Sequence, residues 1–150
     1  MIDAIITDQT ILRQVSRDTT WEEVESLNLI ARLKQSIGVA WTPGLGLAAI
    51  QIHVPVKFAW FRWKDKDHYL INPKIEYGIG KWIYNEGCLS IPGQFIDVER
   101  KYEIEYISDG KKRKAKGMKA VLIQHEVDHC DGILNIDKEY KITVTDGVQK

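Results

Sequence analysis

The twelve residues from Val121 to Gly132, V-L-I-Q-H-E-V-D-H-C-D-G, constrain the fold of this chain more than any other stretch. As a helix, they place His125 and His129 on one face about one turn apart, at the separation that a single metal ion needs. Apolar residues give this helix a face to bury, and Gly132 can end it in the left-handed conformation. Glu126 projects about 100° from His125, close enough to reach a water at the metal without ligating the ion. The stretch predicts a metal-binding helix that also carries a general base.

The H-E-x-x-H pattern has an ordinary alternative, since a surface helix can carry two histidines at this spacing by chance. The remaining sequence decides between the two readings. A chain of 150 residues fits one domain over residues 1–150, large enough to fold without disulfides. Its two cysteines are too few for a disulfide framework, which favours a reducing compartment.

Charge and hydropathy limit the partners of the chain. Twenty-one basic and twenty-one acidic residues give a formal net charge of zero, so no global field attracts DNA or a membrane surface. The N-terminus carries an acidic residue where a signal peptide needs basic ones, and no stretch has the ~20 apolar residues of a membrane span. We therefore expect the chain to stay in the cytoplasm, where it is made.

The first part of the chain predicts one helix. Thr20 and Glu23 form a capping box, and apolar residues recur at helical spacing as far as Gly38, so an amphipathic helix is predicted over residues 21–37. Before it, residues 1–17 carry a short apolar alternation that predicts an edge strand or an extended arm.

The second part of the chain predicts strands. Alternating β-branched and aromatic residues, a polar turn at residues 64–68 and an Asp109-Gly110 hairpin turn predict strands over residues 58–63, 69–77, 94–100, 102–108 and 111–116. We therefore predict an α+β fold in which antiparallel β-sheets pack around the central H-E-x-x-H helix, with the amphipathic helix near the N-terminus.

A catalytic metal site of this kind needs a third protein ligand and a position left for water. The candidates are Cys88, Cys130, His53, His68 and the carboxylates after the helix. Cys130 points away from the ligand face, so we interpret it as a small buried residue. Cys88 lies in E-G-C-L-S, where the preceding glycine lets the backbone approach closely and the thiolate could reach the helix.

Three segments together resemble the signature motifs of the peptide deformylases. They are G-L-G-L-A-A-I-Q at 44–51, E-G-C-L-S at 86–90 and Q-H-E-V-D-H at 124–129, in the order that the family has them. The resemblance implies that one divalent metal is bound by Cys88, His125 and His129. It implies further that Glu126 moves the proton and that Gln51 and Leu89 border the reacting carbonyl.

The implied reaction is hydrolysis of the formyl group from the N-terminal methionine of nascent peptides. The chemistry of the residues agrees, because such a metal generates a nucleophile from water near neutral pH. The side-chain amide of Gln51 and the backbone N–H of Leu89 can stabilise charge on the carbonyl oxygen. The resemblance suggests Fe²⁺ in the cell, with Zn²⁺, Ni²⁺ or Co²⁺ able to substitute.

Other residues are predicted to support this site. Glu86 is a candidate acceptor for the second N–H of a ligating histidine. Arg100 is expected to pair with Asp128 in a buried ion pair, although a surface salt bridge is nearly as good an explanation of Asp128. Residues beside the motifs are candidates for an apolar pocket that accepts methionine, namely Leu45, Gly46, Leu89, Val121 and Leu122.

Two rival functions remain open. A zincin-type metallopeptidase would use the same helix with Asp137 or Glu139 as third ligand. A non-catalytic metal-binding or ribosome-associated module would close the site with a fourth protein ligand such as Cys130. The basic run from Lys111 to Lys116 raises transient ribosome contact, but a solvated strand explains it better.

The chain departs from the family pattern in three places. Ile50 stands where the family often has proline, and Cys130 stands where leucine usually follows the second histidine. Only 18 residues follow Gly132, so the chain resembles the short deformylases of some phages.

Overall fold

The computed structural model describes residues 2–38 and 46–141. The helices are α1 (Gln9–Leu12), α2 (Trp21–Ser26), α3 (Leu29–Gly38) and α4 (Met118–Cys130), with the 3-10 helices η1 (Ala49–Ile52) and η2 (Asn135–Lys138). The strands are β1 (Gly46–Ala48), β2 (Phe58–Trp63), β3 (Lys66–Ile71), β4 (Lys74–Ile79), β5 (Trp82–Cys88), β6 (Ile91–Arg100), β7 (Glu103–Ser108) and β8 (Lys111–Lys116).

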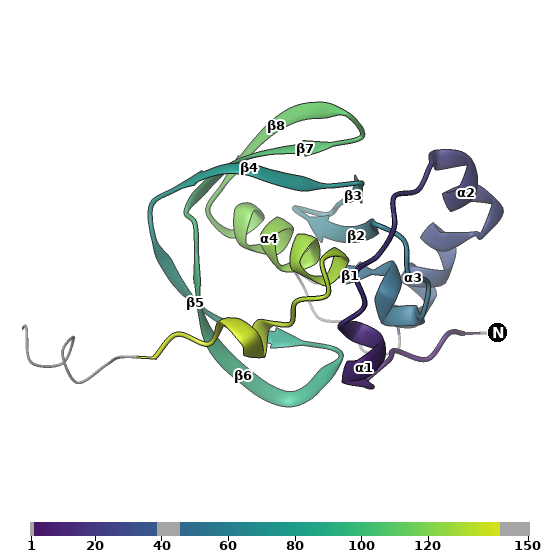
Figure 1. The fold of residues 1–150 in the computed structure, drawn as a ribbon, viewed down its shortest axis with the longest axis horizontal. Helices are drawn as coiled ribbons and strands as arrows, with labels where there is room; N and C mark the ends of the chain where they lie inside the picture. Colours follow the sequence, from purple (N-terminus) through teal and green to yellow (C-terminus); the bar gives the residue numbers. More distant parts are fainter. Residues whose placement is uncertain (1, 39–45, 142–150) are drawn as a thin grey trace, which may run out of the picture.

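The strands form three antiparallel groups around α4. Their orders are β1-β2-β3, β4-β7-β8 and the hairpin β5-β6. Figure 1 shows α4 in the middle, with the β4-β7-β8 sheet on one side of it and the β5-β6 hairpin on the other. The predicted α+β class with antiparallel sheets is therefore confirmed, and the H-E-x-x-H segment lies in the helix that these sheets surround.

Helix α4 is held in place by apolar residues that recur along it. Ala120, Ile123 and Val127 pack into one buried cluster with residues of β1–β3 and of β7. A second buried cluster joins α2 and α3 to the other face of the β1-β2-β3 sheet. Gly132 follows α4 with φ +74°, and a Cβ there would lie 2.5 Å from the carbonyl oxygen of Arg13. Glycine is thus required at this end of α4 by both backbone conformation and close approach.

Two predicted elements are divided in the structure. The helix predicted over residues 21–37 is two helices, because Asn28 adopts a left-handed φ of 52° between them. The prediction of a single strand over residues 69–77 was also wrong. Asn72 has φ 49° and Pro73 follows, so β3 ends at Ile71 and β4 starts in another sheet.

Smaller differences concern turns and the N-terminal segment. The polar turn predicted at residues 64–68 is only Lys64 and Asp65, both with positive φ, and β3 already begins at Lys66. Residues 2–8 are extended without belonging to a strand, and a single helical turn, α1, follows. Strand β5, which carries Cys88 at its end, was not predicted from the sequence.

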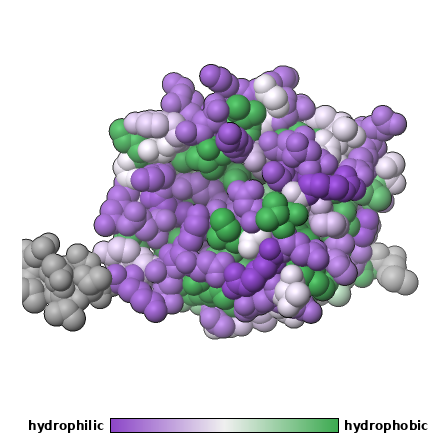
Figure 2. All heavy atoms as spheres, in the orientation of Figure 1, coloured by the Kyte–Doolittle hydropathy of each residue, from purple (hydrophilic) through white to green (hydrophobic). Residues whose placement is uncertain are grey.

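The surface in Figure 2 mixes small hydrophobic areas with larger hydrophilic ones. Over the described ranges 2–38 and 46–141, none of the helices combines the length and the apolarity needed to cross a membrane.

Candidate metal centre

Three ligand atoms from two elements meet beside α4. His125 and His129 lie one turn apart on α4, and Cys88 reaches them from the end of β5. The Nε2 atoms of the two histidines are 3.2 Å apart, and the Cys88 Sγ lies 3.5 Å from Nε2 of His129. In the described part of the chain this is the group whose donor atoms all lie within 4.8 Å of one another.

These donors fit a single divalent ion. Tetrahedral coordination with ordinary zinc bond lengths separates sulfur from nitrogen by about 3.6 Å and two nitrogens by about 3.3 Å. Nδ1 of His125 lies 2.8 Å from Glu86 Oε1. Burial alone would raise the pKa of Glu86, but hydrogen bonds from Arg100 and His125 hold it at about 2. Because an ionised carboxylate only accepts, Nδ1 of His125 donates a hydrogen bond to Glu86, and Nε2 is the ring nitrogen that faces the cluster. Burial works against a charged ring, but Cys88, Glu86 and Glu126 raise the pKa of His125 well above its ordinary value, so a metal ion would replace a proton on Nε2.

His129 also offers a ring nitrogen to the cluster. His129 is 1% exposed, and its Nδ1 has no hydrogen-bond partner among the described residues. Burial, followed by the nearby His125 and Arg100, lowers its pKa well below the ordinary value. A neutral imidazole is the form that ligates a metal ion.

Glu126 lies on α4 beside the cluster without belonging to it. Its side chain is buried, and Oε1 has no hydrogen-bond partner within the described ranges. Burial raises its pKa to about 7, which suits a group that takes up and releases a proton near neutrality. Gly46 leaves the space for it, because a Cβ at that position would lie 2.7 Å from Glu126 Oε2.

Both the oxygen and the nitrogen of the Gln51 side-chain amide are hydrogen-bonded. Its Oε1 accepts from the backbone N–H of Ala48 at 2.9 Å, and its Nε2 donates to Ser90 Oγ at 3.0 Å. The same Nε2 lies 3.9 Å from the Cys88 sulfur, so the amide N–H group is close to the cluster. Sequence reasoning missed Ser90, although it is the last residue of E-G-C-L-S.

A buried ion network lies behind the ligands. Arg100 donates to both oxygens of Glu86, at 2.6 and 2.9 Å, and to Asp128 at 2.6 Å. Lys138 of η2 donates to the other oxygen of Asp128 at 3.0 Å. Arg100 is 2% and Asp128 8% exposed, so Asp128 belongs to a buried network and not to an isolated surface salt bridge. Lys138 was not predicted, because nothing in its local sequence distinguishes it.

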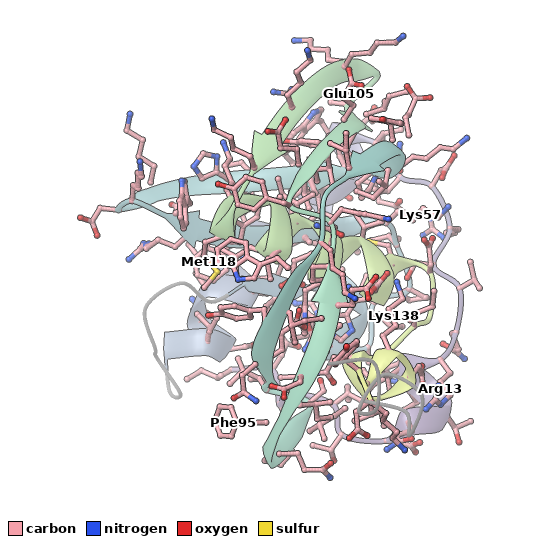
Figure 3. The ribbon with its side chains drawn as sticks, turned by 90° about the vertical axis from the view of Figure 1, so that its left-hand side faces the viewer. Arg13, Lys57, Phe95, Glu105, Met118 and Lys138 are labelled. Atoms are coloured by element: carbon pink, nitrogen blue, oxygen red, sulfur yellow. The ribbon has the colours of Figure 1, made fainter. Side chains whose placement is uncertain are left out.

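A cavity of about 490 Å³ opens beside the three donors. Gly46, Leu89, Val121 and Leu122 line it, as expected for the pocket, while Leu45 lies outside the described residues. Sequence reasoning missed several further residues of its wall, among them Ile5, Tyr84, Phe95 and Met118. Figure 3 shows Phe95 beside the lower part of the β5-β6 hairpin and Met118 near the start of α4, both on the left-hand side of the view.

The other candidate ligands lie elsewhere. Cys130 is 1% exposed, and burial raises its pKa, which favours the neutral thiol over a ligating thiolate. Asp137 accepts from Arg13 at 2.7 Å, and Glu139 forms a bridge with Val98. The donor group found in the described part of the chain contains none of them, and it contains neither His53 nor His68.

The basic run forms strand β8, at the edge of the β4-β7-β8 sheet. Lys114 and Lys116 lie directly across from Glu105 and Glu103 of β7, so acidic neighbours offset part of the charge. The Nζ atom of Lys114 is 3.9 Å from Glu105. This arrangement is typical of a solvated strand.

Comparison with known proteins decides the family. The family model of polypeptide deformylase matches residues 2–144. The chain belongs to the peptide deformylase family. The peptide deformylase of Pelagibacter ubique is 39% identical, over 91% of this chain and 85% of the relative. That of Mesorhizobium japonicum is 37% identical, over 92% of this chain and 84% of the relative.

Solved structures agree with this membership. A peptide deformylase from Thermotoga maritima superimposes with a TM-score of 0.83 at 26% identity, covering 94% of this chain and 99% of that one. A probable peptide deformylase from Synechococcus phage S-SSM7 has a TM-score of 0.79 at 32% identity, covering 89% of this chain and 97% of that one. The α+β fold described above is therefore the fold of this family.

Proposed function

We propose that this chain is a metal-dependent peptide deformylase, which hydrolyses the formyl group from the N-terminal methionine of nascent peptides and releases formate. Family membership supports the activity. The observation that carries the proposal is the convergence of one thiol and two imidazoles beside a cavity and beside a buried glutamate, Glu126, whose Oε1 has no partner among the described residues. The substrate class is an N-formylmethionyl peptide.

We assign the ligand set to Cys88, His125 and His129, which would hold one divalent ion. Such an ion supplies Lewis-acid activation of water and of the formyl carbonyl. Fe²⁺ is the ion proposed for the cell, and a mixed sulfur and nitrogen set also accepts Zn²⁺, Ni²⁺ or Co²⁺. Glu86 fixes the tautomer of His125, and Arg100 and Asp128 hold Glu86 in place.

Proton movement is assigned to Glu126. Its carboxylate takes a proton from the attacking water as the new C–O bond forms at the formyl carbon. It then delivers that proton to the amide nitrogen as the C–N bond breaks, so formate and a free N-terminal amine leave. Burial of Glu126 keeps bulk water from competing for the same proton.

Carbonyl recognition is assigned to the first two motifs. The Gln51 amide is oriented by Ala48 and Ser90 before substrate arrives, so its N–H can meet the carbonyl oxygen without reorganisation. The backbone N–H of Leu89, directly after the cysteine ligand, is the second donor. The methionine side chain would enter the cavity lined by Gly46, Val121 and Leu122.

The rest of the proposal concerns the setting of the enzyme. We propose one deformylase domain over residues 1–150, active as a monomer in the cytoplasm of a bacterium or an infected host cell. Any ribosome contact would be transient, and the partly neutralised β8 strand gives no reason to assign it to Lys111–Lys116.

The test is formate release from a formyl-Met dipeptide by protein prepared without oxygen. Replacing Glu126 with glutamine should lower kcat by about 10²- to 10⁴-fold, because the amide cannot carry the proton. Glu25→Gln on the exposed surface of α2 makes the same chemical change away from the site and should match wild type. Wild type that is no faster than the Glu126→Gln variant would refute the proposed activity.

A metallopeptidase is the second candidate, since the H-E-x-x-H helix alone fits it. It would need a ligand other than Cys88, and Asp137 and Glu139 are engaged elsewhere. Cleavage of an internal peptide bond by the metal-loaded protein, with no formate released, would favour this candidate.

A further inference from the structure

The N-terminal arm, residues 2–7, is fixed to the body of the molecule at two points although it has no regular secondary structure. Near its start, the Asp3 carboxylate accepts from Arg32 Nε at 2.9 Å and from Nη2 at 3.0 Å. The Asp3 carbonyl also accepts from the hydroxyl of Ser36 at 3.0 Å. Near its end, the Ile6 N–H donates to the backbone carbonyl of Gln51 at 2.7 Å. The second attachment therefore reaches a residue assigned to carbonyl recognition.

Two neighbouring side chains of the arm point into different apolar clusters. Ile5 packs against the cluster that Leu89 also joins, and it lines the 490 Å³ cavity. Ile6 packs against the small cluster that contains Cys88 and Ile91. The N-terminal arm thus lies against η1, through Gln51, and against Cys88 and Ile91 where β5 turns into β6, and these three residues also line the cavity.

Ile2 provides the contrast within the same arm. It is 56% exposed and does not line the cavity, whereas Ile5 is half-buried and does. An apolar side chain that reaches an open cavity from an otherwise extended segment offers contact area to an apolar ligand group.

We propose that the N-terminal arm is part of the peptide-binding site, with Ile5 contacting apolar groups of the formyl-peptide as a wall of the cavity. The hydrogen bond from the Ile6 N–H to the backbone carbonyl of Gln51 anchors the arm beside this wall. This inference rests on the proposed deformylase function, because the ligand that Ile5 meets is the substrate of that reaction.

Steady-state kinetics on a formyl-Met-Leu dipeptide test this role. Ile5→Ala should raise KM by about ten-fold and leave kcat within about two-fold, because the lost contact is made equally in the bound and the transition states. Ile5→Leu keeps the volume and should restore most of the affinity. Ile2→Ala on the same arm should show wild-type KM and kcat.

A milder variant protects the test against misfolding. If Ile5→Ala fails to fold by circular dichroism, Ile5→Val removes a single methylene and should still raise KM by about three-fold. Wild-type turnover together with equal KM values for the Ile5 and Ile2 variants would overturn the role of the arm alone. A fall in kcat with unchanged KM would also overturn it, and absence of turnover in wild type would overturn the deformylase function itself.

Discussion

At the scale of single residues, the proposed chemistry depends on a thiol that helix α4 does not supply. Cys130 is next to His129 in sequence but is buried apart from the donor group, whereas Cys88 arrives from a strand 41 residues away along the chain from His129. Cys88→Ala should therefore lose bound metal, since two imidazoles alone hold a divalent ion weakly. Metal per chain, measured after gel filtration without oxygen, checks this.

Cys130→Ala is the matched control for that experiment. It removes the only other thiol and should keep the metal content of wild type. Full metal in the Cys88→Ala protein, or an empty site in the Cys130→Ala protein, would contradict the assigned ligand set.

Gly46 is the second residue on which the site depends. A Cβ there would lie 2.7 Å from both Glu126 Oε2 and Phe61 Cβ, and 2.8 Å from the Trp60 carbonyl oxygen. Because two of these neighbours are backbone or Cβ atoms, they cannot rotate away, and Gly46→Ala should destabilise the fold by about 1–3 kcal/mol. Gly38→Ala, where nothing lies within 4 Å, should change stability by less than about 1 kcal/mol. Urea denaturation of both variants measures the difference.

The sequence predicted the residues that gather at the donor cluster better than the residues that line the rest of the cavity. Cys88, Glu126 and Gln51 lie in three recognisable motifs, and the structure places all three at one cavity. Ile5 and Phe95 reach the cavity from an arm and a hairpin end. No local pattern marks such residues, because their role depends on how distant segments pack.

At the scale of elements, the predicted helix and strand boundaries were wrong where a single residue adopts a left-handed backbone conformation. Asn28 and Asn72 both have left-handed φ values and divide a predicted helix and a predicted strand. Asparagine tolerates this conformation, but its presence in a periodic segment does not reveal whether it adopts it. Strand β5 was not predicted because its residues do not alternate between buried and exposed positions. Trp82, Ile83 and Tyr84 follow one another and are all half-buried.

The start of α2 gives a prediction about pH. Hydrogen bonds from Arg17 and then Thr19 lower the pKa of Glu23 from 4.5 to about 2. A lowered pKa in the folded state means that this stabilisation is fully present above pH 4.5 and is lost as the pH falls toward 2. An NMR titration of the Glu23 carboxyl checks the value, and Arg17→Met should move it back toward 4.5.

The Arg17→Met variant should also show a weaker pH dependence of stability in that range, of which Thr19 and the lowered pKa of Glu86 keep a part. Asp3, whose pKa is lowered by hydrogen bonds from Arg32, offers an internal reference that the change does not touch. A Glu23 pKa that stays near 2 in the variant would show that Arg17 is not its main cause.

At the scale of the whole molecule, one buried cation connects the β5-β6 hairpin to helix α4. Arg100 at the end of β6 contacts Glu86 of β5 and Asp128 of α4, and Asp128 continues to Lys138 of η2. The sheet hairpin, the metal-binding helix and the segment after it are therefore held by a single network. Its burial means that the pairs are not screened by solvent.

Removing that cation should affect both stability and the metal site. Arg100→Met leaves two buried carboxylates without their partner, a change that costs about 3–5 kcal/mol in comparable buried pairs. Arg113→Met removes an exposed arginine from β8 and should cost less than about 0.5 kcal/mol. Chemical denaturation of the two variants compares these costs directly. Glu86 also accepts from Nδ1 of His125, so the Arg100→Met variant should bind metal about 10- to 100-fold more weakly. Equal metal affinity in the two variants would show that the buried network does not support the metal centre.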